Sequence, residues 1–345
     1  MNKFKIESPI FRHSDLKLIG QRINIHKYNS YYMNYTKNLK ENLREFKSKK
    51  YSLIDHDNKY FFSKHKKKPI KRSDILAKII QGKIKDKNLK ILDFGCNKGS
   101  LLKKLSKIGY KNLYGHDLGI HYKKYYKNKK ITFVKNLKRY NSFFHLIIFS
   151  HSIGYSDDIE KLLILIKKIS KEKSLLFFNI QNIEKRPINF FLGDQKYHFN
   201  KKMANNFFSK YGDISFIEND FLFHEILFFL KLKKKEKKKY FHVSPLEIMK
   251  AKNVIKNIKK IRGNCDVLGN NLGAALSVAI LKNKIKNIVV EKTLPHDYFL
   301  KKKIIGIKKH KKNNIPLLVN FCHENRIIIK RLKQKYNLNK IINIK

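Results

Sequence analysis

The sequence is short of cysteine, which limits the chemistry that it can build. Its 345 residues include no tryptophan and only three cysteines, Cys96, Cys265 and Cys322. The three lie far apart, so no pair has the spacing of a zinc site, and a disulfide framework needs more of them. We therefore expect neither a metal site nor a fold stabilised by disulfides.

Long apolar runs are also missing. The most apolar stretch, residues 221–232, has 12 residues and is interrupted by His224 and Glu225, whereas a transmembrane helix needs about 20. The first ten residues contain no apolar run of the length found in signal peptides. These absences predict a soluble protein of the cytoplasm.

Acidic residues are few, because 26 Asp and Glu stand against 79 Lys and Arg, for a net charge of +53. Of the basic residues 70 are Lys and 9 are Arg, and the residues encoded by A- and T-rich codons (Lys, Asn, Ile, Phe and Tyr) exceed half of the chain. A surface selected for phosphate would favour the bidentate Arg fork. Compositional drift therefore explains the charge better than selected polyanion binding, which stays the alternative. Either way, the charge should attract nucleic acid non-specifically at low salt.

The length and the hydrophobic fraction of 42% allow two packed domains. Residues 1–72 show weak periodicity, with one possible helix at 39–46 and a basic loop at 64–69. We interpret this region as an N-terminal extension that covers the next domain.

From residue 73 onwards, apolar runs and helical stripes alternate. They predict strands at 90–94, 112–115, 131–134, 144–149 and 174–179, and helices at 73–81, 100–108 and 200–211. A further helix should begin after Ser156, Asp157 or Asp158. Two final strands, 214–217 and 226–230, are close enough in the chain to pair antiparallel. The pattern predicts an α/β domain at 73–232, a Rossmann-like doubly wound sheet with an antiparallel last strand.

A lysine-rich segment, residues 233–243, is the expected linker to a second domain. After it, Ser244 and Glu247 form a capping box for a helix that runs to about residue 261. Strands are expected at 266–268, 287–290 and 315–321, with helices at 274–281 and 324–336. Residues 244–345 should therefore form a smaller Rossmann-like α/β domain.

The segment from Asp93 to Gly99 carries the clearest chemical signal. A buried strand ends, the chain turns sharply and a helix begins, and glycines at 95 and 99 permit unusual dihedral angles and a close backbone approach. Such a turn is expected to present free backbone N–H groups to a carboxylate or phosphate. Asp117 ends the next strand, so two carboxylates at adjacent strand ends fit a ligand with one ammonium group and one diol. The competing interpretation makes Asp93 a loop-capping residue and Asp117 part of a solvated turn.

This arrangement resembles the first motif of class I S-adenosylmethionine-dependent methyltransferases, in which an acidic residue is followed by alternating glycines. The resemblance covers roughly residues 73–232 and implies that S-adenosyl-L-methionine is the cofactor. Asn97 replaces the middle glycine, His145 stands where the fourth strand usually has Asp, and Lys135 with Asn136 replace the usual acidic contact to adenine. The residues expected to bind the cofactor are Asp93, Gly95, Asn97, Gly99, Asp117 and Ser150.

Methylation of a hydroxyl or carbon atom requires a base, and histidine is the usual one near neutral pH. His151 follows the fourth strand, where the acceptor should approach. Tyr197 and His198 precede the helix at 200–211, and His224 lies between the last two strands. We take His151, His198 and Tyr197 as the candidate catalytic residues, with His224 as a weaker one.

Residues 194–199 look like a region of sugar-methylating methyltransferases in which Tyr and His approach the substrate. Sugar C-methyltransferases also carry a Rossmann-like C-terminal domain, but their N-terminal zinc cysteines and the Gly-Gly turn between the last two strands are missing here. In the C-terminal domain, Gly269, Gly273 and Glu291 could hold a nucleotide part of the acceptor. A simple packing role for the two glycines is the favoured alternative.

Three hypotheses follow. The first is a methyltransferase for a small molecule, a sugar nucleotide or glycan precursor. The second is an RNA or protein methyltransferase that holds a polymer on its basic surface, and the third is a non-catalytic binding module of the same fold. Retention of Asp93 and Asp117 argues against the third, and lysines spread over all faces would favour the first.

Overall fold

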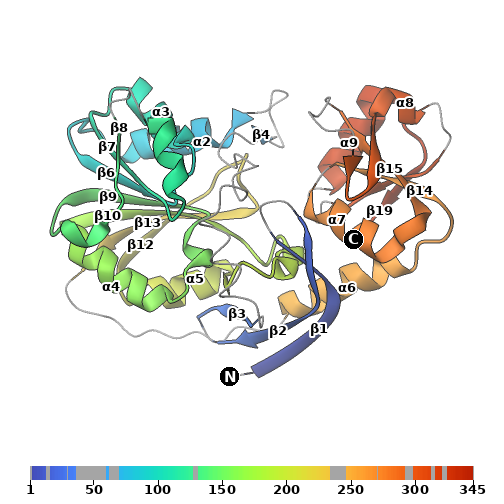
Figure 1. Cartoon of the computed structure of the whole chain (residues 1–345), viewed down its shortest axis with the longest axis horizontal. Coiled ribbons are helices and arrows are strands. Elements are labelled where there is room, and N and C mark those ends of the chain that lie inside the picture. The colour runs from blue at the N-terminus through green and yellow to red at the C-terminus, as the bar shows by residue number, and fades with distance from the viewer. Residues whose placement is uncertain are drawn as a thin grey trace. The chain divides into compact units, whose positions relative to one another are not determined.

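The computed structural model describes residues 2–12, 16–28, 30–35, 60–61, 70–126, 131–233, 246–269, 271–291, 298–311, 315–320 and 325–344 (Figure 1). The expected helix at 39–46, the basic loop at 64–69, most of the lysine-rich linker, Ser244 and Cys322 lie outside them. The chain forms two compact units. The first contains residues 26–182 and 194–243, and the second contains residues 3–25, 183–193 and 244–345.

The first unit is built on a seven-stranded sheet with the order β12-β13-β10-β9-β6-β7-β8. From β8 to β10 all strands are parallel, and counted along the chain their order is 3-2-1-4-5, that of a doubly wound sheet. β13 is antiparallel to both β10 and β12. This confirms the expected Rossmann-like α/β fold with its antiparallel last strand. The strands are β6 (Lys90–Phe94), β7 (Asn112–His116), β8 (Ile131–Phe133), β9 (Phe144–Ser150), β10 (Ser170–Gln181), β12 (Gly212–Ile217) and β13 (Glu225–Leu232).

Helices cover both faces of this sheet, as Figure 1 shows. On one face, α2 (Arg72–Lys83) and α3 (Ser100–Lys107) share a core with Leu146, Ile148 and Phe177. On the other face, near α4 (Ile159–Ile169) and α5 (Lys201–Phe208), the ring of Phe178 packs against Phe208 and stacks on Phe228. Successive strand residues point to opposite faces, which is why the central residues of β9 and β10, such as 146–149 and 175–178, are apolar on both faces.

The N-terminus of α4 is fixed by one of the three candidate caps. The Asp158 carboxylate accepts hydrogen bonds from the backbone N–H groups of Glu160 and Lys161. In the same way Asn200 caps α5, whose helix ends at Phe208, three residues earlier than expected. The reason for the early end is that Gly212 opens β12, so the intervening residues must form a turn.

The N-terminal region contains strands that the sequence did not predict. β1 (Asn2–Phe11) and β2 (Leu18–Lys27) are neighbours in one sheet, and β3 (Tyr32–Tyr35) pairs antiparallel with the short β11 (Tyr197–His198). Another short pair is β4 (Tyr60–Phe61) with β5 (Ile70–Lys71). Alternating buried residues, such as Ile23 and Ile25, do follow the period of a strand. Because polar and basic residues lie between the buried ones, the sequence of this region did not indicate a strand.

The second unit contains a six-stranded sheet with the order β16-β17-β15-β14-β18-β19, parallel except for β16. Helix α9 packs against it through the fully buried Leu332. The edge strands and α8 were not predicted, because their apolar residues are sparse among lysines. The elements are α6 (Leu246–Lys259), β14 (Cys265–Leu268), α7 (Leu272–Leu281), β15 (Ile285–Val290), β16 (Tyr298–Phe299), β17 (Lys302–Gly306), α8 (Ile307–Lys311), β18 (Leu317–Val319), α9 (Asn325–Tyr336) and β19 (Ile341–Asn343).

None of the helices in the described part of the chain is both long and apolar enough to cross a membrane.

Candidate functional site

The topology of the first unit points to one edge of its sheet. β6 and β9 are neighbours, but the chain leaves β6 toward β7 on one side and leaves β9 toward β10 on the other. In open α/β sheets, ligands bind at such a switch point, beyond the carboxyl ends of the strands. Asp93 is the penultimate residue of β6, Ser150 ends β9 and Asp117 directly follows β7. The predicted cofactor residues are therefore gathered at this edge.

The loop after β6 has three residues in the left-handed region, with φ of 82° at Gly95, 48° at Asn97 and 72° at Gly99. Glycine adopts this conformation without steric cost, and asparagine is among the few other residues that adopt it readily. Asn97 therefore replaces the middle glycine of the expected motif without a change in the backbone of the loop.

The expectation of free N–H groups in this loop is wrong at four positions. The N–H groups of Gly95 and Cys96 donate to the carbonyl of His116, at 2.8 and 3.1 Å, and the N–H of Gly99 donates to the carbonyl of Cys96. The N–H of Asn97 donates to Oδ2 of Asp117 at 3.0 Å. These bonds close the loop onto the end of β7, so the loop is preformed.

Asp117 joins the two halves of this site. Besides the bond from Asn97, its Oδ1 accepts the N–H of Gly119 at 2.9 Å. Burial raises the pKa of Asp117, although the backbone donors around it act in the opposite direction. A carboxylate has about four acceptor positions, and the backbone N–H groups of Asn97, Gly119 and Leu118 act on Asp117, so it can hold the loop and still accept at least one hydroxyl group. The two interpretations of Asp117, loop support and ligand binding, are thus compatible.

The residues present fit S-adenosylmethionine, but the two glycines have a different role from the expected one. The buried Oδ1 of Asn97 has no hydrogen-bond partner among the described residues, which leaves an acceptor at the ligand edge. The glycines, however, make room for the protein itself. A Cβ on Gly99 would lie 2.7 Å from the hydroxyl of Tyr126, and one on Gly95 would lie 2.6 Å from Cβ of Ser152.

The side chain of Asp93 is buried, whereas that of Asn136 caps a turn. Asp93 is only 1% exposed, as expected for a carboxylate meant to meet an ammonium group out of water. The side chain of Asn136, at the position of the usual adenine contact, instead accepts the N–H of Lys138 and caps a short 3₁₀ turn.

His151 is held firmly just beyond β9. Its backbone is left-handed, with φ of 55°, and its N–H donates to the carbonyl of Asn179 at 2.8 Å. Nε2 of the imidazole lies 3.2 Å from Oε1 of Glu225. Non-glycine residues in this conformation are uncommon and cluster at functional sites.

Glu225 and Arg72, which lie next to this site, were not predicted from the sequence. Glu225 is paired with Arg72, accepts a hydrogen bond from Nδ2 of Asn179 and lies 3.6 Å from Nε2 of His224. Burial by itself raises the pKa of Glu225, but Arg72 and His151 outweigh it and hold the pKa well below its usual value. One signal was available in the sequence: an antiparallel strand begins where its parallel neighbours end, so the first residue of β13 must lie at the ligand edge.

A very small pocket, with a volume of about 10 Å³, opens beside His151, so it has room for a single reacting group and not for a whole acceptor molecule. Its lining includes neutral hydrogen-bonding side chains and no Lys or Arg, and it consists of His151, Ile153, Gly154, Tyr155, Ile180, Gln181, Gln195, Tyr197 and Phe199. This is where the sequence predicted the approach of the acceptor.

Tyr197 and His198 point in different directions, because successive residues of β11 alternate. Tyr197 lines the pocket, and burial raises its pKa to about 12. His198 is not in the lining. It is 1% exposed, its Nε2 lies 2.7 Å from Nδ2 of Asn34, and burial lowers its pKa to about 3. The surroundings of His198 therefore favour a structural role over that of a base.

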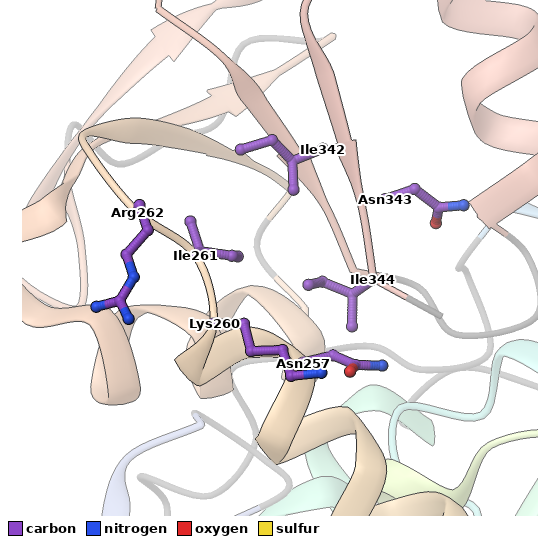
Figure 2. Close-up of a pocket in the computed structure, with 7 residues that line it drawn as sticks. All are labelled: Asn257, Lys260, Ile261, Arg262, Ile342, Asn343 and Ile344. Atoms are coloured by element: carbon purple, nitrogen blue, oxygen red, sulfur yellow. The ribbon is translucent and has the colours of Figure 1, made fainter.

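In the second unit, the start of α7 is tightly packed at Gly273. A Cβ on Gly273 would lie 1.8 Å from the carbonyl oxygen of Asn320, which agrees with the packing interpretation of this glycine. Glu291 is paired with Arg331 and accepts a bond from the hydroxyl of Tyr336. An open pocket lies elsewhere in this unit, between the end of α6 and β19 (Figure 2). It is lined by Asn257, Lys260, Ile261, Arg262, Ile342, Asn343 and Ile344.

Comparisons with known proteins agree with this fold. The family model described as "Methyltransferase domain" matches residues 56–209. No curated protein matches the sequence.

Solved structures that resemble the chain include a putative type 11 methyltransferase from Sulfolobus solfataricus, with 21% identity and a TM-score of 0.38 over 49% of this chain and 96% of that one. A SAM-dependent methyltransferase from Archaeoglobus fulgidus has 16% identity and a TM-score of 0.37, over 46% and 94%. A protein from Pyrococcus horikoshii OT3 has 14% identity and a TM-score of 0.39, over 47% and 90%. The match of the central segment to the family model, on a sheet with the doubly wound order described above, identifies the chain as an enzyme with a class I S-adenosylmethionine-dependent methyltransferase domain.

Proposed function

We propose that this enzyme methylates a hydroxyl group of a small, sugar-related molecule, such as a sugar nucleotide or a glycan precursor. The observation that carries the proposal is the pocket beside β9 and β10. His151, Gln181, Gln195 and Tyr197 line it, and no cation does. Amide, imidazole and phenol groups can both donate and accept hydrogen bonds, which suits an acceptor rich in hydroxyl groups. Because no cation lines the pocket, it suits the uncharged sugar part of the acceptor, and any phosphate of a sugar nucleotide would have to lie outside it.

The charge of the surface supports the same choice. Exposed lysines occur on α2, α3 and α4 of the first unit and on α6 and α9 of the second; examples are Lys78, Lys107, Lys168, Lys256 and Lys330. Lysines distributed over so many elements are expected from compositional drift. An RNA-binding enzyme would be expected to concentrate them in a patch near the site.

The proposed roles of the residues follow from their places. Asp93, Gly95, Asn97, Gly99, Asp117 and Ser150 hold the cofactor, Asp117 through an acceptor position that the backbone leaves open. When bound, S-adenosylmethionine supplies a methyl group whose bond to a positively charged sulfur breaks with the electron pair left on sulfur. The pocket orients the acceptor, which lowers the entropic part of the barrier. His151 takes the proton of the acceptor hydroxyl.

The acceptor class can be tested with S-adenosylmethionine that carries a labelled methyl group. The full chain is incubated with a pool of nucleoside diphosphate sugars, with total transfer RNA and with a mixture of unfolded proteins. We expect label only in the sugar pool, and none in any pool with the Asp117→Ala variant. Label confined to RNA or protein would overturn the proposal in favour of a polymer acceptor.

A further inference from the structure

The carboxylate of Glu225 is held in a position that suits a second role at the site. It is the first residue of β13, and its partners come from three other segments: Arg72 from α2, Asn179 from β10 and His151 from the residue after β9. Its side chain is 1% exposed and that of Arg72 is 4% exposed. A buried charged pair is costly to form unless its geometry is good and its remaining positions are bonded. Here both oxygens of Glu225 have partners.

His151 lies between this buried carboxylate and the pocket. Nε2 is buried and lies 3.2 Å from Oε1 of Glu225, a distance that allows an ion pair, although the present orientation of the ring is not that of a regular hydrogen bond. The side chain of His151 also lines the pocket. The backbone N–H of His151 is bonded to Asn179, and Asn179 also donates to Glu225. The same asparagine therefore fixes both the backbone of the histidine and the carboxylate that faces its ring.

We propose that Glu225, anchored by Arg72, is a positioning residue that keeps the proton of neutral His151 on Nε2 and leaves Nδ1 as the proton acceptor toward the pocket. With a small rotation of the ring, the carboxylate 3.2 Å away would accept the Nε2–H bond, which would restrict the ring and fix its tautomer. When the proton of the acceptor hydroxyl reaches Nδ1, Glu225 also stabilises the imidazolium that forms. The inference rests on the proposed role of His151 as the base, and it adds the group that controls this base.

The charged and titratable groups around His151 come from every element packed against it. Glu225 and His224 approach from the start of β13, Arg72 from α2, and Tyr155 and Tyr197 from the pocket wall. Among them only Glu225 is negatively charged at neutral pH. Loss of this charge should therefore disfavour the imidazolium.

The first test needs no substitution in the network. ¹⁵N NMR of the full chain, labelled at histidine, reports which ring nitrogen carries the proton above the pKa of each ring, and the His151→Gln variant identifies the signals of His151. We expect the proton on Nε2. A proton on Nδ1 would overturn the proposal, and because the wild-type chain is used, the result does not depend on whether a variant folds.

The second test removes the charge of Glu225 and keeps its shape. In the Glu225→Gln variant we expect the pKa of His151 to fall by about 1 or more, whereas Glu218→Gln, an exposed control in the same unit, should leave it unchanged. An unchanged pKa of His151 in Glu225→Gln would contradict the proposal. If Arg72 without its partner prevents folding, the double variant Arg72→Met with Glu225→Gln removes both charges and is titrated instead. Binding of S-adenosylmethionine, followed by calorimetry, should stay within about threefold of the wild type.

The two proposals fail separately. If the sugar pool is not methylated but the tautomer and the titration are as expected, the arrangement of Glu225 and His151 stands and only the acceptor is wrong. If a sugar acceptor is methylated, Glu225→Gln should lower kcat by at least about tenfold with little change in KM, since it acts only on proton transfer. In that assay Glu225→Asp should recover part of the loss.

Discussion

At the scale of single residues, Asp117 shows how one side chain serves both fold and ligand. It fastens the loop after β6 through Asn97, and it retains an acceptor position for a hydroxyl group. This dual use explains why the sequence could not decide between a loop residue and a ligand residue. The residue type is the same for both, and only the neighbouring N–H groups show which positions are occupied.

We expect Asp117→Ala to weaken binding of S-adenosylmethionine by about 10- to 100-fold, because a hydrogen bond to a charged acceptor contributes roughly 1.5–3 kcal/mol. Isothermal titration calorimetry measures the change. Asp213→Ala, at an exposed position of β12, is the control and should bind like the wild type. Equal affinity in the two variants would show that Asp117 only supports the loop.

His198 gives a pH dependence with a definite sign. Its folded pKa of about 3 is below the usual 6.5, so near pH 5 the unfolded chain binds a proton that the folded chain does not. Stability from this residue is complete above pH 6.5 and is lost as the pH falls toward 3. Between pH 7 and pH 5 the loss should be about 2 kcal/mol.

Denaturant unfolding at the two pH values checks this, with His198→Gln as the comparison. The variant is expected to be less stable at pH 7, because its contact to Asn34 changes, but its stability should decrease less on going to pH 5. If both chains lose the same amount, another group is responsible for the pH dependence.

At the scale of elements, the packing of α7 against the end of β18 depends on one residue without a side chain. A Cβ on Gly273 would fall within 1.8 Å of a backbone oxygen, which cannot turn away as a flexible side chain could. The same glycine carbonyl accepts a bond from Nδ2 of Asn320 at 2.9 Å. The helix and the strand are therefore fitted to each other at backbone distance.

Gly273→Ala should lower the free energy of unfolding by about 1–3 kcal/mol, the usual cost of overpacking. Gly306→Ala is a matched control in the same unit, since a Cβ there would meet nothing within 4 Å. Thermal unfolding of the two variants and the wild type gives the comparison. A Gly273→Ala protein as stable as the control would mean that α7 can shift without cost.

Elements with a clear period were predicted from the sequence, and others were not. Leu101, Leu102 and Leu105 are all fully buried on α3, as their helical spacing indicated. β1 and β2 were missed because Lys, Asn, Gln and Arg occupy the residues between their buried positions, so the alternation resembled an irregular region. Short edge strands such as β16 and β19 have two or three residues and contain no full period.

At the scale of the whole molecule, the charge of +53 should produce binding that is separate from catalysis. We expect a short DNA duplex of random sequence to bind at 50 mM salt and to lose at least about 100-fold in affinity by 300 mM, because the binding energy comes from released counterions. Over the same range the affinity for S-adenosylmethionine should change by less than about threefold. Fluorescence anisotropy and calorimetry measure the two affinities. Strong RNA binding that persists at 300 mM salt would instead favour a polymer acceptor.

The division of the chain also appears only at this scale. Residues 3–25 and 183–193 belong to the same compact unit as residues 244–345, although they are far from them in sequence. The sequence suggested a linear arrangement, an extension followed by two domains, because composition and periodicity report on local segments. Contacts between distant segments leave no local signal.

By itself the sequence determined the doubly wound order of elements and the positions of Asp93, Gly95, Gly99 and Asp117, since hydrophobic period and turn residues are local properties. Only the tertiary structure decided that Glu225, paired with Arg72, lies beside His151, that His198 is outside the pocket lining, and that the glycine loop accommodates Tyr126. Such contacts join segments that are far apart in the sequence, as Arg72 and Glu225 are by 153 residues, and they depend on which sheet edge each strand end reaches.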